Sequence, residues 1–390
     1  MDNENQKAYD KFPFCREDVL TNFECYSRKQ LKLYSSKRNF DLGSPHKDVS
    51  KLSPYLRRRL ISENEVLHIA LRKNTPSSLE KFIQEIFWRT YWRGWLEMRP
   101  NVYQDYADSS SEADFPGKTG IKCFDHWTEE LMETGYLHNH ARMWYASIWI
   151  FTLRKSWLSG ANFFKDHLLD WCPASNTLGW RWVAGLQTRG KIYSAKSDNI
   201  KLFTNNRFFP KGELNENPVF DESMWKTYES SSNIPYENQN LPTDENIGLI
   251  INKNDLTLNR YLSEKQIEFE GCIFHDPEYQ NSKSASVQKF ESGLIDQLCL
   301  ELKNFHFCRS KKALTSWAKS KKIKCLIFPF ETVGNKYFME NKFINELRSQ
   351  NIEAIFYMRD WDRYAFPHAN KGFFPFKKNI SDLLERNGLI

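Results

Sequence analysis

The chain has 390 residues, a length that suits two domains or one large domain. It carries 55 Lys and Arg against 49 Asp and Glu, which gives a formal net charge of +6, and 27% of its residues are charged. No apolar run approaches the ~18 residues of a membrane span, and the polar start MDNENQKAYDK predicts no secretory signal peptide. We therefore expect a cytoplasmic protein that does not enter the membrane.

Cysteine usage and the absence of common motifs narrow the chemistry further. The eight cysteines are scattered without a C-x-x-C pair, which predicts reduced thiols and no zinc site. The sequence has no P-loop, no G-x-G-x-x-G, no H-E-x-x-H and no G-x-S-x-G motif, so we expect neither metal ligands nor a serine hydrolase. The 13 tryptophans are more than a core needs, so a function for some of them has to be considered.

Helical patterns dominate about the first 210 residues, and no alternating strand pattern occurs there. Two capping boxes, Ser62-x-x-Glu65 and Ser77-x-x-Glu80, mark helix starts because their side chains satisfy free backbone amides. The helices expected from these signals and from the apolar spacing cover residues 62–73, 77–98 and 138–155.

The composition changes at about residue 209, where a segment rich in Pro, Asn and Ser runs to residue 246. After it, short β-rich runs alternate with helical ones, which predicts a parallel sheet with helices on its faces. Strands are expected at 247–252, 272–275, 325–328 and 352–358, and helices at 294–303, 311–320 and 336–350. The predicted fold is an α-helical domain (1–232), a linker (233–246), and a smaller α/β Rossmann-like domain (247–390) with a mainly parallel sheet.

One face of the predicted helix 77–98 is both charged and aromatic. Glu85, Trp88, Arg89 and Trp92 fall at i, i+3, i+4 and i+7, so they share that face. A cavity that stacks a planar ligand and hydrogen-bonds its edge uses this mixture. The alternative is a surface Glu85–Arg89 pair beside two partly buried indoles.

A second polar face lies on the predicted helix 138–155, where Asn139, Arg142 and Met143 share one side. A buried arginine needs a partner, and Asp170 is the candidate. The pair either forms part of a ligand pocket or is a structural link between two helices.

Tryptophans and basic residues offer two further signals. Trp157, Trp180 and Trp182 lie in neighbouring predicted segments, where they either relay electrons or simply pack. The basic residues of 28–38 and 57–59 form either a surface for a polyanion or a solvated helix face.

Together these runs resemble the DNA photolyases and cryptochromes over most of residues 8–210. The family's blocks recur in the family's order: YSSKRNFDL, VSKLSP, EIFWRTYWR, GKTG, HNHARM and DWCPASNTLGWRW. More weakly, the carboxyl-terminal half resembles the photolyase α/β domain, which usually holds an antenna pigment and precedes the helical domain. Here it follows the helical domain, so the chain resembles a compact, rearranged member of the family.

The resemblance implies a U-shaped, buried FAD in the helical domain; it leaves the antenna chromophore unknown. Asn176 would lie beside the flavin N5 atom, and the segment VSKLSP would hold the pyrophosphate. The residues expected to contact the cofactor are Tyr34, Val49, Ser50, Lys51, Leu52, Ser53, Arg89, Arg142, Asp170, Cys172 and Asn176.

The same resemblance implies blue-light-driven repair of cyclobutane pyrimidine dimers in UV-damaged DNA by a monomer that receives the dimer flipped out of the helix. Trp180 and Trp157 would carry electrons to the flavin, while Arg38 and His140 would contact DNA. The residues expected to line the lesion pocket are Glu85, Trp88, Asn139, Met143 and Trp182.

The sequence departs from the family pattern at several of these positions. Cys172 stands where a second Asp is usual, His140 where photolyases carry Arg, and Thr177 where a second Asn is usual. The third tryptophan of the electron-transfer chain has no clear counterpart. The alternative function is therefore a cryptochrome-like photoreceptor that binds FAD and does not repair DNA.

Overall fold

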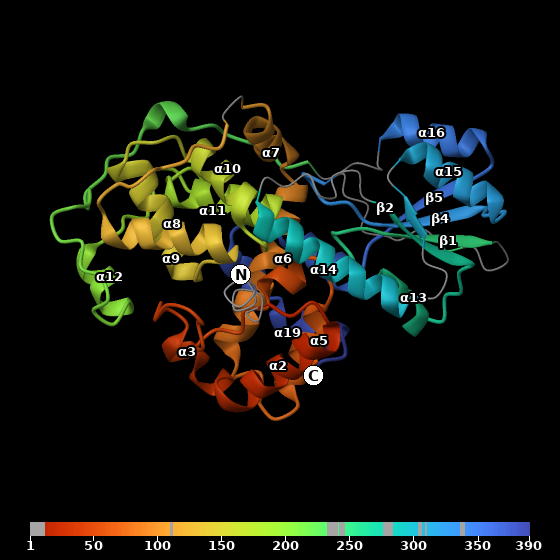
Figure 1. The fold of residues 1–390 in the computed structure, drawn as a ribbon, viewed down its shortest axis with the longest axis horizontal. Coiled ribbons are helices and arrows are strands. Elements are labelled where there is room, and N and C mark those ends of the chain that lie inside the picture. The colour runs from red at the N-terminus through yellow and green to blue at the C-terminus, as the bar shows by residue number, and fades with distance from the viewer. Residues whose placement is uncertain are drawn as a thin grey trace, which may run out of the picture.

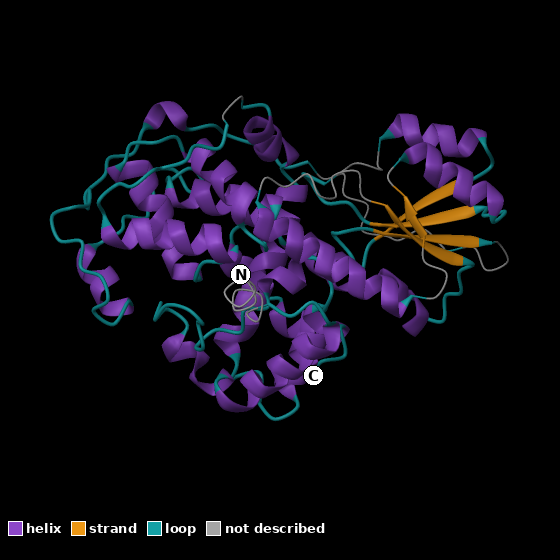
Figure 2. Cartoon of the chain, in the orientation of Figure 1, coloured by secondary structure: helices purple, strands orange, loops and turns teal. Residues whose placement is uncertain are grey.

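The computed structural model describes residues 12–109, 112–231, 241, 246–275, 284–302, 306–308, 310–335 and 340–390. A large helical body forms one end of the molecule, and a five-stranded sheet with its own helices forms the other (Figures 1 and 2). No helix within these described ranges is both long and apolar enough to cross a membrane.

Eleven helices of the described part, up to residue 203, build most of the helical body. Their bounds are α2 (Arg16–Lys29), α3 (Tyr34–Lys37), α4 (Ser53–Arg57), α5 (Glu63–Leu71), α6 (Glu80–Glu97), α7 (Pro100–Ala107), α8 (Lys122–Thr134), α9 (Asn139–Ser147), α10 (Trp157–His167), α11 (Pro173–Val183) and α12 (Ser197–Phe203).

The three helices expected in this region form, but some of their first and last residues differ from the predicted ones. At α5 the capping box is present, since Ser62 and Glu65 bond each other's backbone amides. The second predicted box does not form: α6 follows Leu79 and has no side-chain cap. The helix expected to reach residue 155 ends as α9 at Ser147, after which Ile148–Thr152 form a π-helical turn.

Five parallel strands form the sheet, in the order β3-β2-β1-β4-β5. Their bounds are β1 (Ile247–Ile251), β2 (Gly271–His275), β3 (His306–Cys308), β4 (Cys325–Pro329) and β5 (Glu353–Tyr357). Every residue of β1 and β4 is buried, as expected of central parallel strands covered on both faces. The four predicted strands are confirmed to within two residues, whereas β3 was not predicted.

Helices cover both faces of this sheet (Figure 1). On one face, α15 (Lys311–Ser320) and α16 (Asn341–Ser349) pack on Ile250, Leu326 and Phe328. On the other, α13 (Leu258–Glu264) and α14 (Ala285–Glu301) share a core with the amino-terminal helices of the helical body. Helix α14 also contacts α8 and α10, so it lies between the sheet and the helical body.

The predicted fold class is wrong in one respect: the α/β layer does not occupy the whole carboxyl-terminal part. After β5 the chain returns to the helical body as α17 (Asp360–Ala365), α18 (Phe373–Lys377) and α19 (Ile380–Arg386). Both α17 and α18 pack on α6. The helical body is therefore built from both ends of the chain, and the sheet segment is inserted between them. The predicted linker 233–246 lies outside the described residues except at positions 241 and 246.

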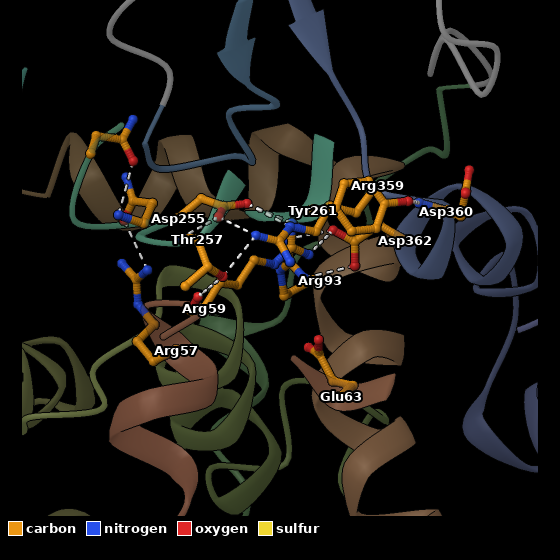
Figure 3. A network of polar contacts seen from close by, with 12 residues as sticks. Arg57, Arg59, Glu63, Arg93, Asp255, Thr257, Tyr261, Arg359, Asp360 and Asp362 are labelled. Carbon is orange, nitrogen blue, oxygen red and sulfur yellow. Dashed lines mark hydrogen bonds and ion pairs between the residues drawn. The ribbon is translucent and has the colours of Figure 1, made fainter. Parts of the chain in front are cut away.

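A buried polar network joins this returning segment to the helical body (Figure 3). Both carboxylate oxygens of Asp362 accept hydrogen bonds from Arg93, at 2.8 and 2.9 Å, and Arg59 donates a further bond to Asp362. Nearby, Arg359 donates two hydrogen bonds to Asp255, at 2.9 and 2.5 Å. Because Arg59 and Arg93 lie near the amino end of the chain and Asp362 near the other, these ion pairs fix the two segments against each other.

Candidate functional site

The Arg142–Asp170 pair forms as the sequence predicts. Arg142 of α9 donates two parallel hydrogen bonds to the Asp170 carboxylate, at 3.0 and 2.8 Å, and a third to the Leu137 carbonyl at 3.0 Å. Burial lowers the pKa of Arg142, but Asp170 raises it by more, so the guanidinium stays charged. The Asp170 side chain is 4% exposed, which makes this a buried, bidentate pair.

The segment expected to hold the pyrophosphate borders a pocket of about 390 Å³. Residues 49–52 form one wall, and Ser53 begins α4 directly behind them. Lys29 and Lys47 also line the pocket and give it positive charge. Tyr55 also lines the pocket, and its buried hydroxyl has no hydrogen-bond partner among the described residues. A largely apolar pocket that also carries lysine side chains fits a ligand with an aromatic part and a phosphate, such as FAD.

Aromatic rings connect this pocket to the Arg142–Asp170 pair. Phe12 lines the pocket, and its ring centroid lies 5.6 Å from that of Tyr136, over which the Arg142 guanidinium sits at 5.5 Å. The two predicted cofactor elements therefore lie in one region of the helical body.

Next to Tyr136 lies a buried acid–histidine group that the sequence analysis missed. Nε2 of His46 and a carboxylate oxygen of Glu130 are 2.6 Å apart, and the His46 ring lies 5.4 Å from that of Tyr136. Burial lowers the pKa of the neighbouring His138 to about 4, so that ring is neutral at pH 7. No spacing rule pairs His46 with Glu130, because 84 residues separate them in the chain.

Arg38 and Glu85, predicted from separate motifs, lie together. The Arg38 guanidinium is 3.6 Å from the Glu85 carboxylate. Burial raises the pKa of Glu85, and Arg38 offsets part of that rise. Beside them the ring of Tyr34 meets Phe82 edge-on at 5.2 Å.

A chain of contacts continues from this pair to Trp182. The ring of His140 bonds the Asn39 carbonyl through Nδ1 at 2.9 Å and the Tyr193 hydroxyl through Nε2 at 3.3 Å. The Tyr193 ring lies 5.3 Å from that of Trp182. Because Asn39 directly follows Arg38, its bond to His140 links the Arg38–Glu85 pair to Tyr193 and Trp182. We call these five residues, Arg38, Glu85, His140, Tyr193 and Trp182, the rim. Tyr193 was not predicted.

Of the residues expected to line the lesion pocket, one is exposed, one is half-buried, and a third, Trp88, packs against another part of the chain. Asn139 is exposed and Met143 half-buried on α9. The ring of Trp88 stacks on Phe373 of α18, with centroids 3.6 Å apart and planes at 12°. The returning carboxyl-terminal segment thus covers one face of Trp88.

Trp180 is 2% exposed, and its ring contacts that of Trp149. The Trp180 and Trp149 centroids are 6.2 Å apart at 83°. Gly160 allows this approach, because a Cβ there would lie 2.3 Å from Trp180 and 2.9 Å from Trp149. Trp157 stacks on Tyr106 at 6.0 Å.

The remaining predicted cofactor residues make protein contacts. Arg89 donates a hydrogen bond to Glu63 at 2.7 Å, and the Asn176 amide donates one to the Ala161 carbonyl at 2.9 Å. Burial raises the pKa of Cys172, but Arg57 and Arg89 together lower it below its ordinary value. The substitution of Cys for the family's Asp therefore places a thiol against arginines, where a carboxylate would also be stabilised.

Comparisons with known proteins show what part of the helical region is similar to. Residues 82–203 match the family model described as the FAD binding domain of DNA photolyase. The deoxyribodipyrimidine photo-lyase of Alkalihalophilus pseudofirmus is 27% identical over 199 residues, which are 48% of this chain and 41% of that protein. The Streptomyces griseus enzyme of the same name is 33% identical over 175 residues, 39% of this chain and 38% of that protein.

Among solved structures, a cryptochrome from Synechocystis sp. PCC6803 overlaps 49% of this chain and 43% of its own, with a TM-score of 0.43 and 23% identity. The matched parts span less than half of the length of each of these relatives. Residues 82–203 are similar in sequence to a photolyase-type FAD-binding domain. Through this region the chain resembles the DNA photolyase/cryptochrome family.

Proposed function

We propose that this protein binds FAD and uses blue light to drive electron transfer that splits cyclobutane pyrimidine dimers in DNA. The observation that carries the proposal is the rim, in which residues from four separate sequence motifs adjoin one another. Such a rim supplies charge for a phosphate or base edge and aromatic faces for a flipped-out base.

In this proposal the helical body holds the cofactor with its own charges and hydroxyls. Residues 49–53 bind the pyrophosphate, and the Arg142–Asp170 pair orients the flavin ring. When bound, FAD supplies blue-light absorption and one-electron transfer. The surrounding aromatic residues, among them Tyr136 and Trp180, exclude water from it.

At the rim, Arg38 and Glu85 bind the extruded dimer, and the indole of Trp182 stacks on it. A dimer costs less to extrude than a normal base pair, because the damaged step is already poorly stacked. Burial raises the pKa of Glu85, and a protonated Glu85 would donate a hydrogen bond to a dimer carbonyl.

Replacement of Trp180 by phenylalanine is expected to slow photoreduction of the flavin by about tenfold or more. Phenylalanine is much harder to oxidise than indole, and each ~1.4 kcal/mol added to the barrier slows the reaction tenfold. Flavin absorbance followed after a blue flash measures the rate. Trp317→Phe, on α15 of the sheet, is the matched control and should leave the rate unchanged. A wild-type rate in Trp180→Phe would show that the electron comes by another route.

The second candidate is a photoreceptor that keeps the light-driven flavin chemistry and does not repair DNA. The stacking of Trp88 on Phe373 supports it, because that face of the indole is not open to a lesion. The two hydrogen bonds that hold the His140 ring support it as well. Light would then change the redox state of the flavin without loss of dimers from added DNA.

A further inference from the structure

A second hollow, which none of the rim residues lines, lies between α7, α10, α11 and residues 215–228. Its volume is about 600 Å³, within the range of about 300–1,000 Å³ that small-molecule sites occupy. Part of the polar segment after residue 209 forms one wall, through Pro218, Val219 and Met224. None of the residues expected to hold FAD lines it.

Part of its lining is aromatic, from Tyr106, Phe151, Trp157 and Tyr228. Trp157 and Tyr106 stack with centroids 6.0 Å apart and planes at 25°. Tyr228 also lines the hollow and donates its hydroxyl hydrogen to Asp105 at 2.9 Å. A flat ring entering the hollow would therefore meet the half-buried face of an indole.

Two arginines in the lining form no ion pair with a carboxylate among the described residues. Arg181 is 5% exposed; it donates a hydrogen bond to the Leu186 carbonyl and interacts with Tyr228 and Asp105, while its Nε atom is buried without a partner in that part of the chain. Arg154 is exposed and makes no hydrogen bond or ion pair with a described residue. Burial lowers the pKa of Arg181 in spite of these contacts, so an anionic ligand would stabilise its charge.

The other charges of the lining are largely satisfied. Lys226 pairs with Asp105 at 2.7 Å, and Lys155 pairs with Asp114 at 2.5 Å. Asp221 accepts a hydrogen bond from the Ser223 amide at 3.0 Å. Among the positive charges of the lining, that of Arg154 has no partner among the described residues, and that of Arg181 is only partly offset by Asp105.

We propose that this hollow binds a planar aromatic ring carrying an anionic group, with the ring against Trp157 and the anion between Arg154 and Arg181. Guanidinium groups bind phosphate and carboxylate in a planar, bidentate way, and indole faces bind aromatic rings. The site is separate from that proposed for FAD and does not depend on DNA repair.

The test is a titration of FAD-saturated protein with FMN, followed by the quenching of FMN fluorescence, with riboflavin as the probe that has the same ring and no phosphate. We expect saturable quenching and at least about tenfold weaker binding of riboflavin. Equal binding of the two probes, no saturable quenching, or release of FAD into a filtrate would overturn the proposal.

Variants of the lining residues test whether FMN binds in this hollow. Arg154→Gln should lower the affinity for FMN toward that for riboflavin, and Trp157→Phe should weaken both the binding and the quenching. Lys312→Gln, an exposed charge change on α15, should alter neither. Because Arg154 is exposed, its variant is expected to keep the wild-type melting temperature. FMN affinity that is unchanged in both site variants would place the binding elsewhere and contradict the proposal.

Discussion

Replacement of Asp362 by asparagine is expected to lower the free energy of unfolding by about 3–5 kcal/mol, the usual effect of removing one partner from a buried ion pair. The Asp362 side chain is 1% exposed and pairs with Arg59 and Arg93, which are 6% and 8% exposed. The variant leaves the buried Arg93 guanidinium without a carboxylate partner among the described residues, and it leaves Arg59 with Asp255 alone, at 3.5 Å. Urea denaturation measures the change in stability.

Asp382→Asn on α19 is the matched control. Its partner, Arg386, lies four residues away on the same helix, and both side chains are about half exposed, at 54% for Arg386 and 51% for Asp382. An exposed pair of this kind contributes about 0–1 kcal/mol. Similar denaturation midpoints for the two variants would contradict the role assigned to the buried network.

The contribution of Asp362 should also depend on pH. Burial raises the pKa of its carboxyl, but Arg59 and Arg93 lower it by more, so the folded-state value lies below the ordinary one. A depressed carboxyl pKa contributes stability above the unfolded-state value, about 3.9, and loses it as the pH falls. The difference in stability between wild type and Asp362→Asn should therefore shrink below about pH 4, and a difference that grew there would contradict the sign.

Replacement of Arg142 by alanine is expected to destabilise the protein by about 3–5 kcal/mol and to release the flavin. It leaves Asp170, 4% exposed, as an uncompensated buried charge at the proposed cofactor site. Flavin absorbance after desalting and the urea midpoint measure the two effects separately. Arg142→Lys keeps the charge and loses the bidentate geometry, so it should retain more of the stability than alanine does.

Arg189→Ala is the control for this variant. Arg189 pairs with Glu222 at 2.9 Å, but both side chains are 63% exposed, so the expected change is about 0–1 kcal/mol. Wild-type flavin content together with a wild-type midpoint in Arg142→Ala would refute both the structural and the cofactor role of the pair.

The parts of the fold that local patterns encode could be predicted. Apolar runs bounded by polar residues located β1, β2, β4 and β5, and the Ser62 box located α5. Strand β3 has three residues, too few for a pattern to show. The return of α17–α19 to the helical body depends on ion pairs between residues about 270 to 300 positions apart, which no local signal reveals.

The candidate site likewise has contacts that the sequence could predict and contacts that it could not. The Arg142–Asp170 pair could be predicted from the sequence, because a buried arginine needs an acidic partner. The contacts of Trp180 with Trp149 and of Trp88 with Phe373 depend on how helices pack, and helical spacing within one segment says nothing about them. Tyr193 is a single aromatic residue in a loop, and only its position beside Trp182 shows that it belongs to the rim.

The most direct test of the proposed function is blue-light illumination of the FAD-containing protein with a reductant and an oligonucleotide that carries one cyclobutane thymine dimer. A dark sample and the Glu85→Ala variant serve as controls. We predict light-dependent loss of the dimer by the wild type, much slower loss by the variant and none in the dark. Flavin that is reduced by light while the dimer persists would contradict repair and favour the photoreceptor.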